Sequence, residues 1–200
     1  MSRALIATVV EGQGEVAAVP VLLRRMAAEI APEVSLELPR PYRVGRGSLL
    51  LPHGLERVVA AVAEQGDRTP GILILLDADD DCPAELGPRL LARARTARPD
   101  QPGSVVLANR EFEAWFLAAA PSLCGQRGLP SELAPPADAE SSRDCKGWLS
   151  ERRVDGRSYK PTTDQAALSA VFDMQMARKN SPSFDKLWRD VERLLTEVVL

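Results

Sequence analysis

The sequence predicts an α/β fold in which a parallel sheet of about four strands is flanked by helices and followed by a C-terminal helical extension. Short apolar runs alternate along the chain with longer segments whose apolar residues recur at helical spacing, which is typical of right-handed βαβ units. The run 71–76 is apolar throughout, as in a strand that helices cover on both faces. A length of 200 residues with 45% hydrophobic content fits one domain.

Each expected element follows from its local pattern. The strands are short, apolar and followed by turn residues or carboxylates, and we expect them at 4–10, 34–38, 71–76 and 104–107. The helices show apolar residues three and four positions apart, and we expect them at 15–30, 55–63, 83–94, 109–120, 162–178 and 182–195. Pro83 suits a first helical position, and Thr162 with Gln165 fits a capping box.

Composition divides the chain into three segments. Residues 1–120 form the α/β core, and residues 121–161 are rich in Pro, Gly, Ser and charged residues, as in a loop-rich insert. Residues 162–200 are expected to form a C-terminal helical pair that packs on the core.

The overall charge is nearly balanced. Lys and Arg number 25 against 28 Asp and Glu, a net charge of −3, so the chain is not a strongly basic nucleic-acid-binding domain. Separate acidic and basic faces remain compatible with this sum. We expect a soluble, cytoplasmic protein without a membrane segment, because there is neither a signal-peptide pattern nor a long uncharged apolar run.

The cysteine and histidine content limits the chemistry. Cys82, Cys124 and Cys145 are odd in number and far apart, which argues against a disulfide framework. With His53 as the one histidine, a Cys/His zinc site cannot be assembled. Any metal ion would have to be bound by oxygen.

Carboxylates follow two of the predicted strands. Glu11 ends the first strand, Asp77 and Asp79 end the third, and Glu15 lies one helical turn beyond Glu11. Because ligands collect beyond the carboxyl ends of parallel strands, we expect these side chains to converge on Mg²⁺ or Mn²⁺. The ordinary alternative is that the acids of 79–81 cap the following helix.

A second interpretation concerns the turn after the first strand. Gly12, Gly14 and Ala17 fit the dinucleotide-binding pattern G-x-G-x-x-A, with Glu37 in the place of a ribose-binding acid. Glu11 and Glu15 oppose it, because they would put negative charge beside a pyrophosphate. The sequence contains no P-loop motif of an ATPase.

The order of these motifs resembles the Toprim domain of topoisomerases, primases and nucleases of the overcoming-lysogenization-defect type. Over nearly its full length the chain is similar to a bacterial family of Toprim-like proteins, domain of unknown function 4276. The stretches that carry this resemblance lie at 10–12, 15, 43–47, 75–81, 111–115, 145–149, 159–162 and 181–184. The resemblance implies a Toprim-like, Rossmann-related fold.

The resemblance also implies roles for five acids. Glu11 would bind metal or transfer a proton, and Asp77 and Asp79 would hold a Mg²⁺ bridged to a phosphodiester. Glu15 would contribute to a second metal site, and Glu113 would be a further ligand. The implied chemistry is metal-assisted phosphodiester hydrolysis.

Basic residues provide candidates for phosphate contacts. Lys160 is the candidate for a catalytic cation near the scissile phosphate, although a solvated lysine would look the same. Arg40, Arg43 and Arg46 form a positive stretch that could follow a nucleic-acid backbone, or simply pair with surface acids.

Two functional hypotheses follow. The first is a Mg²⁺- or Mn²⁺-dependent nuclease or nuclease-like subunit. By resemblance it would act on nucleic acid beside an ATPase of the structural-maintenance-of-chromosomes type, as the effector of an anti-phage defence system. The second is a non-catalytic binding or interaction subunit that retains the fold.

Overall fold

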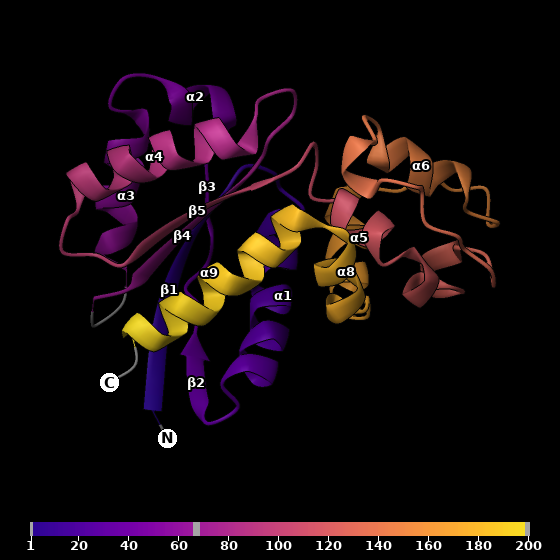
Figure 1. Cartoon of the computed structure of the whole chain (residues 1–200), viewed down its shortest axis with the longest axis horizontal. Helices are drawn as coiled ribbons and strands as arrows, with labels where there is room; N and C mark the ends of the chain where they lie inside the picture. Colours follow the sequence, from indigo (N-terminus) through magenta and orange to yellow (C-terminus); the bar gives the residue numbers. More distant parts are fainter. Residues whose placement is uncertain (1, 66–68, 199–200) are drawn as a thin grey trace.

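The computed structural model describes residues 2–65 and 69–198 (Figure 1). Residues 1, 66–68 and 199–200, which belong to the predicted segments 1–120 and 162–200, lie outside the described residues. The division of the chain at residues 120 and 161 stays a prediction.

A parallel sheet forms the centre of the molecule. Its strands are β1 (Ser2–Val10), β2 (Val34–Glu37), β3 (Tyr42–Arg43), β4 (Gly71–Asp77) and β5 (Gly103–Ala108). The order across the sheet is β2-β1-β4-β5, and the short strand β3 pairs with β1 beyond the end of β2. The α/β fold class and the four expected strands are confirmed; β3 was not predicted because two residues carry no periodicity.

Helices cover both faces of this sheet (Figure 1). The α-helices are α1 (Glu15–Ile30), α2 (Arg46–Leu50), α3 (Gly54–Ala63), α4 (Pro83–Ala97), α5 (Ala114–Ala118), α6 (Cys145–Glu151), α7 (Ala166–Ser169), α8 (Met174–Asn180) and α9 (Pro182–Val198). Helices α1 and α9 pack on one face, whereas α2, α3 and α4 pack on the other. None of the helices in the described ranges is long and apolar enough to cross a membrane.

The alternating direction of the side chains along β4 explains why helices pack on both faces of the sheet. Leu73 and Leu75 join the core beneath α1 and α9, while Ile72, Ile74 and Leu76 join the core beneath α3 and α4. Successive strand residues point to opposite faces, so an apolar run of this length belongs to a strand buried on both sides.

The prediction of a single helix over residues 162–178 is wrong. A π-helical turn, η4 (Pro161–Gln165), is followed by α7 and α8. Thr162 and Gln165 form no capping box: the backbone N–H of Lys160 donates to Asp164 (2.8 Å), and Gln165 turns toward Glu113. Asp173 then starts α8 by accepting the backbone N–H of Met176 (2.9 Å).

The helix expected over 109–120 is shorter than predicted. Turns occupy residues 109–113, and α5 covers only Ala114–Ala118 before the 3₁₀ turn η1 (Ala120–Leu123). Aromatic packing holds this region: the rings of Trp115 and Phe184 lie 5.3 Å apart, and those of Phe116 and Phe172 lie 5.4 Å apart.

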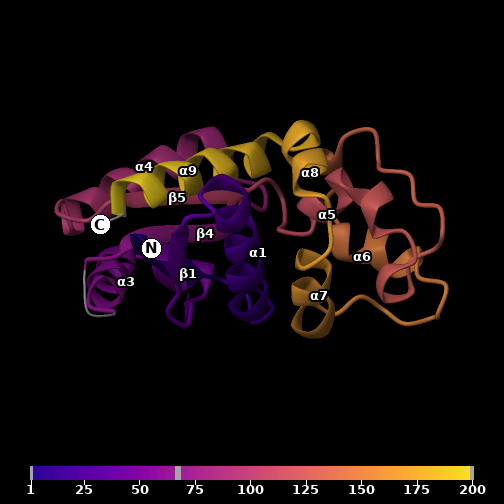
Figure 2. The same cartoon turned by 90° about the horizontal axis from the view of Figure 1, so that it is seen from below.

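Four short helices, α5, α6, α7 and α8, lie together beside the sheet (Figure 2). The 3₁₀ turns of this region are η2 (Gln126–Gly128) and η3 (Ala139–Ser141). Cys82, Cys124 and Cys145 are all free, which agrees with the absence of a disulfide framework.

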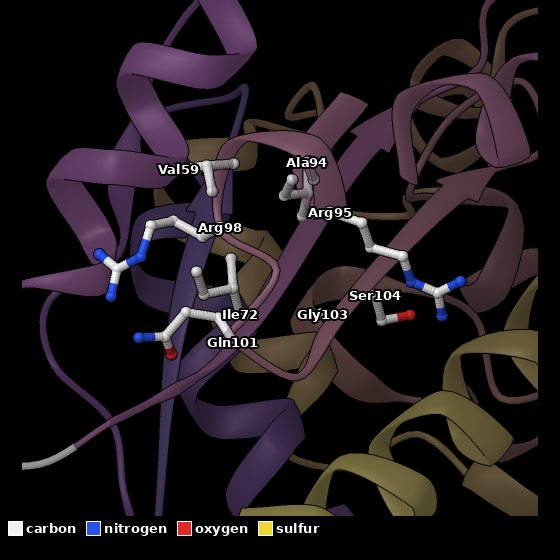
Figure 3. A pocket seen from close by; sticks show the side chains of 9 residues that line it. Val59, Ile72, Ala94, Arg95, Arg98, Gln101, Gly103 and Ser104 are labelled. Carbon is white, nitrogen blue, oxygen red and sulfur yellow. The ribbon is translucent and has the colours of Figure 1, made fainter. Parts of the chain in front are cut away.

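A small apolar cavity lies at the amino end of the sheet. Val59, Ile72 and Ala94 line it, and its volume is about 10 Å³, too little for a ligand (Figure 3). The guanidinium groups of Arg95 and Arg98 extend away from it to opposite sides. This end of the molecule therefore contributes to packing.

The start of α9 depends on one buried carboxylate. Glu140 accepts the backbone N–H of Ser183 (2.9 Å), the side-chain amide of Asn109 (3.1 Å) and the hydroxyl of Ser181. The Ser183 hydroxyl in turn accepts the indole N–H of Trp115 (2.8 Å). Glu140 therefore joins η3, the turn after β5 and the start of α9 into one hydrogen-bonded unit.

We predict that Glu140→Ala lowers the free energy of unfolding by about 2–4 kcal/mol, because it leaves several buried donors unpaired. Urea denaturation measures this change. The control Glu132→Ala removes an exposed carboxylate and should alter stability by less than about 0.5 kcal/mol. Equal stabilities of the two variants would contradict this role of Glu140.

Candidate functional site

A cleft of about 330 Å³ opens at the carboxyl edge of the sheet. It lies where the strand order changes direction between β1 and β4, the place where open α/β sheets bind ligands. Its lining combines acidic, basic and amide side chains with a glycine-rich turn: Glu11, Gly12, Gln13, Gly14, Glu15, Asp77, Glu113, Lys146, Pro161, Thr162 and Gln165. Four of the five acids predicted to bind metal therefore lie together.

Glu15 is almost fully buried at the start of α1. One of its carboxylate oxygens accepts the backbone N–H groups of Glu11 (2.9 Å) and Gly12 (3.1 Å). Burial, reinforced by the neighbouring carboxylates of Glu113 and Glu11, raises the pKa of Glu15 to about 7. These N–H groups are the ones that a pyrophosphate would use in the dinucleotide-binding interpretation, so this arrangement disfavours that interpretation.

Gly14 is required by a close approach of the chain to the same turn. A Cβ atom at this position would lie 2.6 Å from the carbonyl oxygen of Pro161 and 2.3 Å from the side-chain oxygen of Gln165. The glycine therefore allows η4 to close one side of the cleft. This contact explains the residue without a dinucleotide.

Asp77 ends β4 and points into the cleft. Its Oδ1 atom accepts the backbone N–H of Phe112 at 2.7 Å, which ties the end of β4 to the loop after β5. Burial raises the pKa of Asp77 well above its usual range, and the charges of Glu15 and Glu113 add to this effect. The ionised form of Asp77 therefore needs a nearby cation.

Glu113 is completely buried and has three side-chain partners, which come from α6, the segment after α6 and η4. The Tyr159 hydroxyl donates to its Oε1 at 2.9 Å, and the Gln165 amide donates to the same oxygen at 3.3 Å. The Lys146 ammonium lies 3.1 Å from its Oε2. Burial raises the pKa of Glu113, although Lys146 and Tyr159 oppose this shift.

Lys146 is the cleft residue that the sequence did not single out. It lies in the first turn of α6, and its Nζ atom contacts Glu111 (3.0 Å) as well as Glu113. Burial lowers the pKa of Lys146, but the carboxylates of Glu113 and Asp77 outweigh burial and raise it. The signal available in the sequence was a lysine beside a capping aspartate, Asp144, in a segment expected to be a loop.

Glu11 lies just beyond β1 at the edge of the cleft. Its Oε2 atom is buried and has no hydrogen-bond partner among the described residues. Burial and the negative charge of Asp79 raise the pKa of Glu11, while the charge of Arg46 opposes this change. Glu11 therefore has one buried carboxylate oxygen without a hydrogen-bond partner among the described residues, beside the cleft.

Asp79 does not share the cleft with Asp77, contrary to the expectation from strand alternation. The strand ends at Asp77, and the backbone of Asp79 turns into the left-handed region with φ of 50°. Its side chain is 62% exposed and lies 3.7 Å from Arg46. Asp79 thus acts on the cleft through its charge near Glu11 rather than as part of the lining.

The predicted basic residues also lie outside the cleft. Arg40 and Arg43 are exposed on the loop and strand before α2. Arg46 donates to the carbonyl oxygen of Asp77 and to Asp81, so acids of the β4–α4 loop engage it. Lys160 lies on the far side of η4, in a neighbouring hollow.

One family model matches most of the chain. The model for a domain of unknown function (DUF4276) matches residues 10–192. The chain belongs to the DUF4276 family. No curated protein and no solved structure matches it.

The fit of this DUF4276 site to a divalent cation is partial. The donor chemistry fits, because buried carboxylates with raised pKa values repel one another and Glu11 keeps an unpaired oxygen. Among residues 2–65 and 69–198, however, no three acidic side chains are grouped so that they could hold one ion. The cation that the cleft contains is the ammonium of Lys146.

We predict that Glu15→Gln changes how stability depends on pH. Because the pKa of Glu15 rises from 4.5 to about 7 on folding, its contribution is complete at low pH and is lost as the pH rises through 7. Between pH 5 and pH 8, in EDTA, the wild type should lose about 2 kcal/mol of unfolding free energy relative to Glu15→Gln.

Urea denaturation at both pH values measures this difference. Gln retains the oxygen that accepts the N–H groups of Glu11 and Gly12, so the comparison isolates the charge. Glu85→Gln, at an exposed position of α4, serves as the control and should follow the wild type. Parallel pH profiles of Glu15→Gln and the wild type would contradict the prediction.

Proposed function

We propose that this protein is a Mg²⁺- or Mn²⁺-dependent hydrolase of phosphodiester bonds, either a nuclease or a nuclease-like subunit. One observation carries the proposal. Four acids line one cleft with Lys146 at the switch point of the sheet, although they come from the ends of two strands, a loop and a helix. These acids are Glu11, Asp77, Glu113 and Glu15. Helix capping explains single acids but not this convergence.

The charge of the cleft supports a cation-dependent reaction. Two buried carboxylates, Glu15 and Glu113, and the half-buried Asp77 face the half-buried ammonium of Lys146, so the site carries excess negative charge once the three acids are ionised. Glu11, Asp77 and Glu113 are the candidate ligands; since no three acids are grouped around one point in the described residues, one or two of them would bind the ion directly and water would complete its coordination. When bound, the ion would activate water and stabilise charge on the oxygens of the phosphodiester.

Lys146 is the proposed cationic residue of the reaction, in place of Lys160. Its ammonium already lies among the carboxylates, where it can also contact a phosphate oxygen and stabilise negative charge that develops there. Lys160 lies outside this cleft.

The Toprim relationship and the partners are part of the same proposal. The Glu-Gly turn after β1, the acid at the end of β4 and the acid after β5 follow the Toprim order. Nucleic acid is the proposed substrate. The resemblance further suggests an ATPase of the structural-maintenance-of-chromosomes type as a partner in anti-phage defence.

A non-catalytic binding subunit is the second candidate. The observation that favours it is the pairing of Lys146 with Glu111 and Glu113 in a region without a closed metal-ligand group in the described residues. In that case the lysine would serve as a permanent counter-ion, and no cation would be needed.

We predict that the purified protein cleaves plasmid, linear DNA or RNA in Mg²⁺ or Mn²⁺, and that Asp77→Asn lowers kcat at least about 100-fold. Asn keeps the acceptor for the Phe112 N–H and removes the charge. Gel-based cleavage assays measure the rate, with Glu132→Gln as the exposed control. Cleavage that Asp77→Asn leaves unchanged would point to a contaminant and reject the assignment.

We also predict opposite effects of Lys146→Gln on metal affinity and on turnover. Removing the ammonium beside Glu113 should tighten Mn²⁺ binding about tenfold, because the ion no longer competes with a fixed positive charge. The same change should lower kcat. Mn²⁺ titration monitored by electron paramagnetic resonance and the cleavage assay give the two readouts.

The control for that experiment is Lys179→Gln on the exposed side of α8, which should change neither quantity. If Lys146→Gln neither tightens Mn²⁺ binding nor slows cleavage, the lysine has no part in the site. Failure of the wild type to bind Mn²⁺ would favour the non-catalytic candidate.

A further inference from the structure

A second hollow, of about 600 Å³, lies on the other side of η4 from the acidic cleft. Basic and hydroxyl side chains dominate its lining, which consists of Arg127, Arg153, Arg157, Ser158, Lys160, Thr163 and Asp164. We call these residues the basic hollow. Nothing in the cleft chemistry described above uses them.

Asp164 fixes the floor of the basic hollow. Its carboxylate is 4% exposed and accepts the guanidinium of Arg127 at 2.8 Å, that of Arg153 at 3.2 Å and the backbone N–H of Lys160 at 2.8 Å. Arg153 also pairs with Asp155 at 2.6 Å. Two arginines are therefore held in position before any ligand arrives, which lowers the entropic cost of binding.

Arg127 supplies a further sign of a constrained site. Its backbone has φ of 50°, in the left-handed region that a non-glycine residue rarely adopts. The guanidinium of the same residue donates to Asp164. The conformation directs a cation toward the hollow.

The charges of the basic hollow do not cancel. Four basic side chains stand against the two carboxylates of Asp164 and Asp155. They are Arg127, Arg153, Arg157 and Lys160. The side chains of Arg157 and Lys160 are exposed and form no hydrogen bond or ion pair within the described part of the chain. This surplus of two positive charges can be satisfied by phosphate groups.

The basic hollow and the acidic cleft share a wall. Pro161 and Thr162 line the cleft, whereas Lys160 and Thr163 line the hollow. Adjacent Cα atoms are about 3.8 Å apart, so the two sites lie within a few residues of each other along η4. Successive phosphates of one strand rise by about 3.4 Å in a duplex and lie further apart when the strand is extended. A strand in the cleft would thus reach the hollow within a few nucleotides.

We infer that the basic hollow binds the phosphodiester backbone of a nucleic-acid strand that passes over η4 from the acidic cleft. The inference rests on the proposed function for the identity of the strand, and it adds where the substrate is held. The hollow recognises phosphate, which DNA and RNA share, so base sequence contributes little to binding here.

The test measures binding without catalysis. Fluorescence anisotropy in EDTA follows fluorescein-labelled 20-mers of single-stranded DNA, RNA and duplex DNA on the wild type and on Arg157→Glu/Lys160→Glu. The double variant should bind at least about tenfold more weakly to the strand that the wild type prefers. Its salt dependence should be shallower by about 1.4 in the log–log slope for a single strand, as expected for two lost phosphate contacts.

A matched control separates this effect from net charge. Arg89→Glu/Lys179→Glu makes the same change in charge at exposed positions of α4 and α8, and its affinity should stay within about twofold of the wild type. Equal weakening in both double variants, or in neither, would overturn the inference. Absence of binding to all three oligonucleotides by the wild type would also overturn it.

The cleavage assay keeps this inference separate from the proposed function. If both hold, Arg157→Glu/Lys160→Glu raises KM and leaves kcat nearly unchanged, because the cleft is intact. If the strand binds through the basic hollow but no nucleic acid is cleaved, the inference stands and the hydrolase proposal fails. If cleavage proceeds with an unchanged KM in the double variant, the hydrolase stands and the inference fails.

Discussion

The buried carboxylate of Glu113 is the interaction on which the rest of the site depends. It lies at the carboxyl edge of the sheet, where it meets Lys146 from α6, Tyr159 from the segment after α6, and Gln165 from η4. An unpaired charge at this depth would be strongly destabilising, so these partners have to stay in place. Glu113 thereby attaches the loop-rich segment to the α/β core, together with apolar residues such as Leu149 and Tyr159 that join the same core. Electrostatics therefore positions the wall of the cleft as well as its contents.

Acidic and basic side chains gather in separate places on the molecule, which the net charge does not reveal. The net charge of −3 conceals an acidic cleft and a basic hollow on opposite sides of η4. Among the arginines expected to form the basic face, Arg46 is engaged by Asp79 and Asp81, whereas Arg40 and Arg43 are exposed. Within the basic hollow, the side chains of Arg157 and Lys160 have no ion pair among the described residues. A strand with both a reactive phosphate and flanking phosphates would match this pair of surfaces.

Backbone strain at the ends of β4 and β5 helps to define the cleft. Asp79 and Arg110 both adopt positive φ, of 50° and 66°, and the N–H of Asp79 donates to the carbonyl oxygen of Arg110 at 3.0 Å. These turns end the two strands together and carry Asp79 out of the cleft while Asp77 stays inside. Such conformations persist where surrounding contacts hold them, and they cluster at functional sites.

The sequence by itself determined the layers of the fold and most of the acids in the cleft. Alternation and helical spacing are local properties, so β1, β4, α1 and α4 could be predicted from them, and the strand ends then located Glu11 and Asp77. The tertiary structure alone decided that Lys146, rather than Lys160, joins these acids, and that Asp79 does not. Both outcomes depend on contacts between distant segments and on a left-handed turn, which no local periodicity encodes. The raised pKa of Glu15 also depends on the tertiary structure, because it arises only when the carboxylates are brought together away from water.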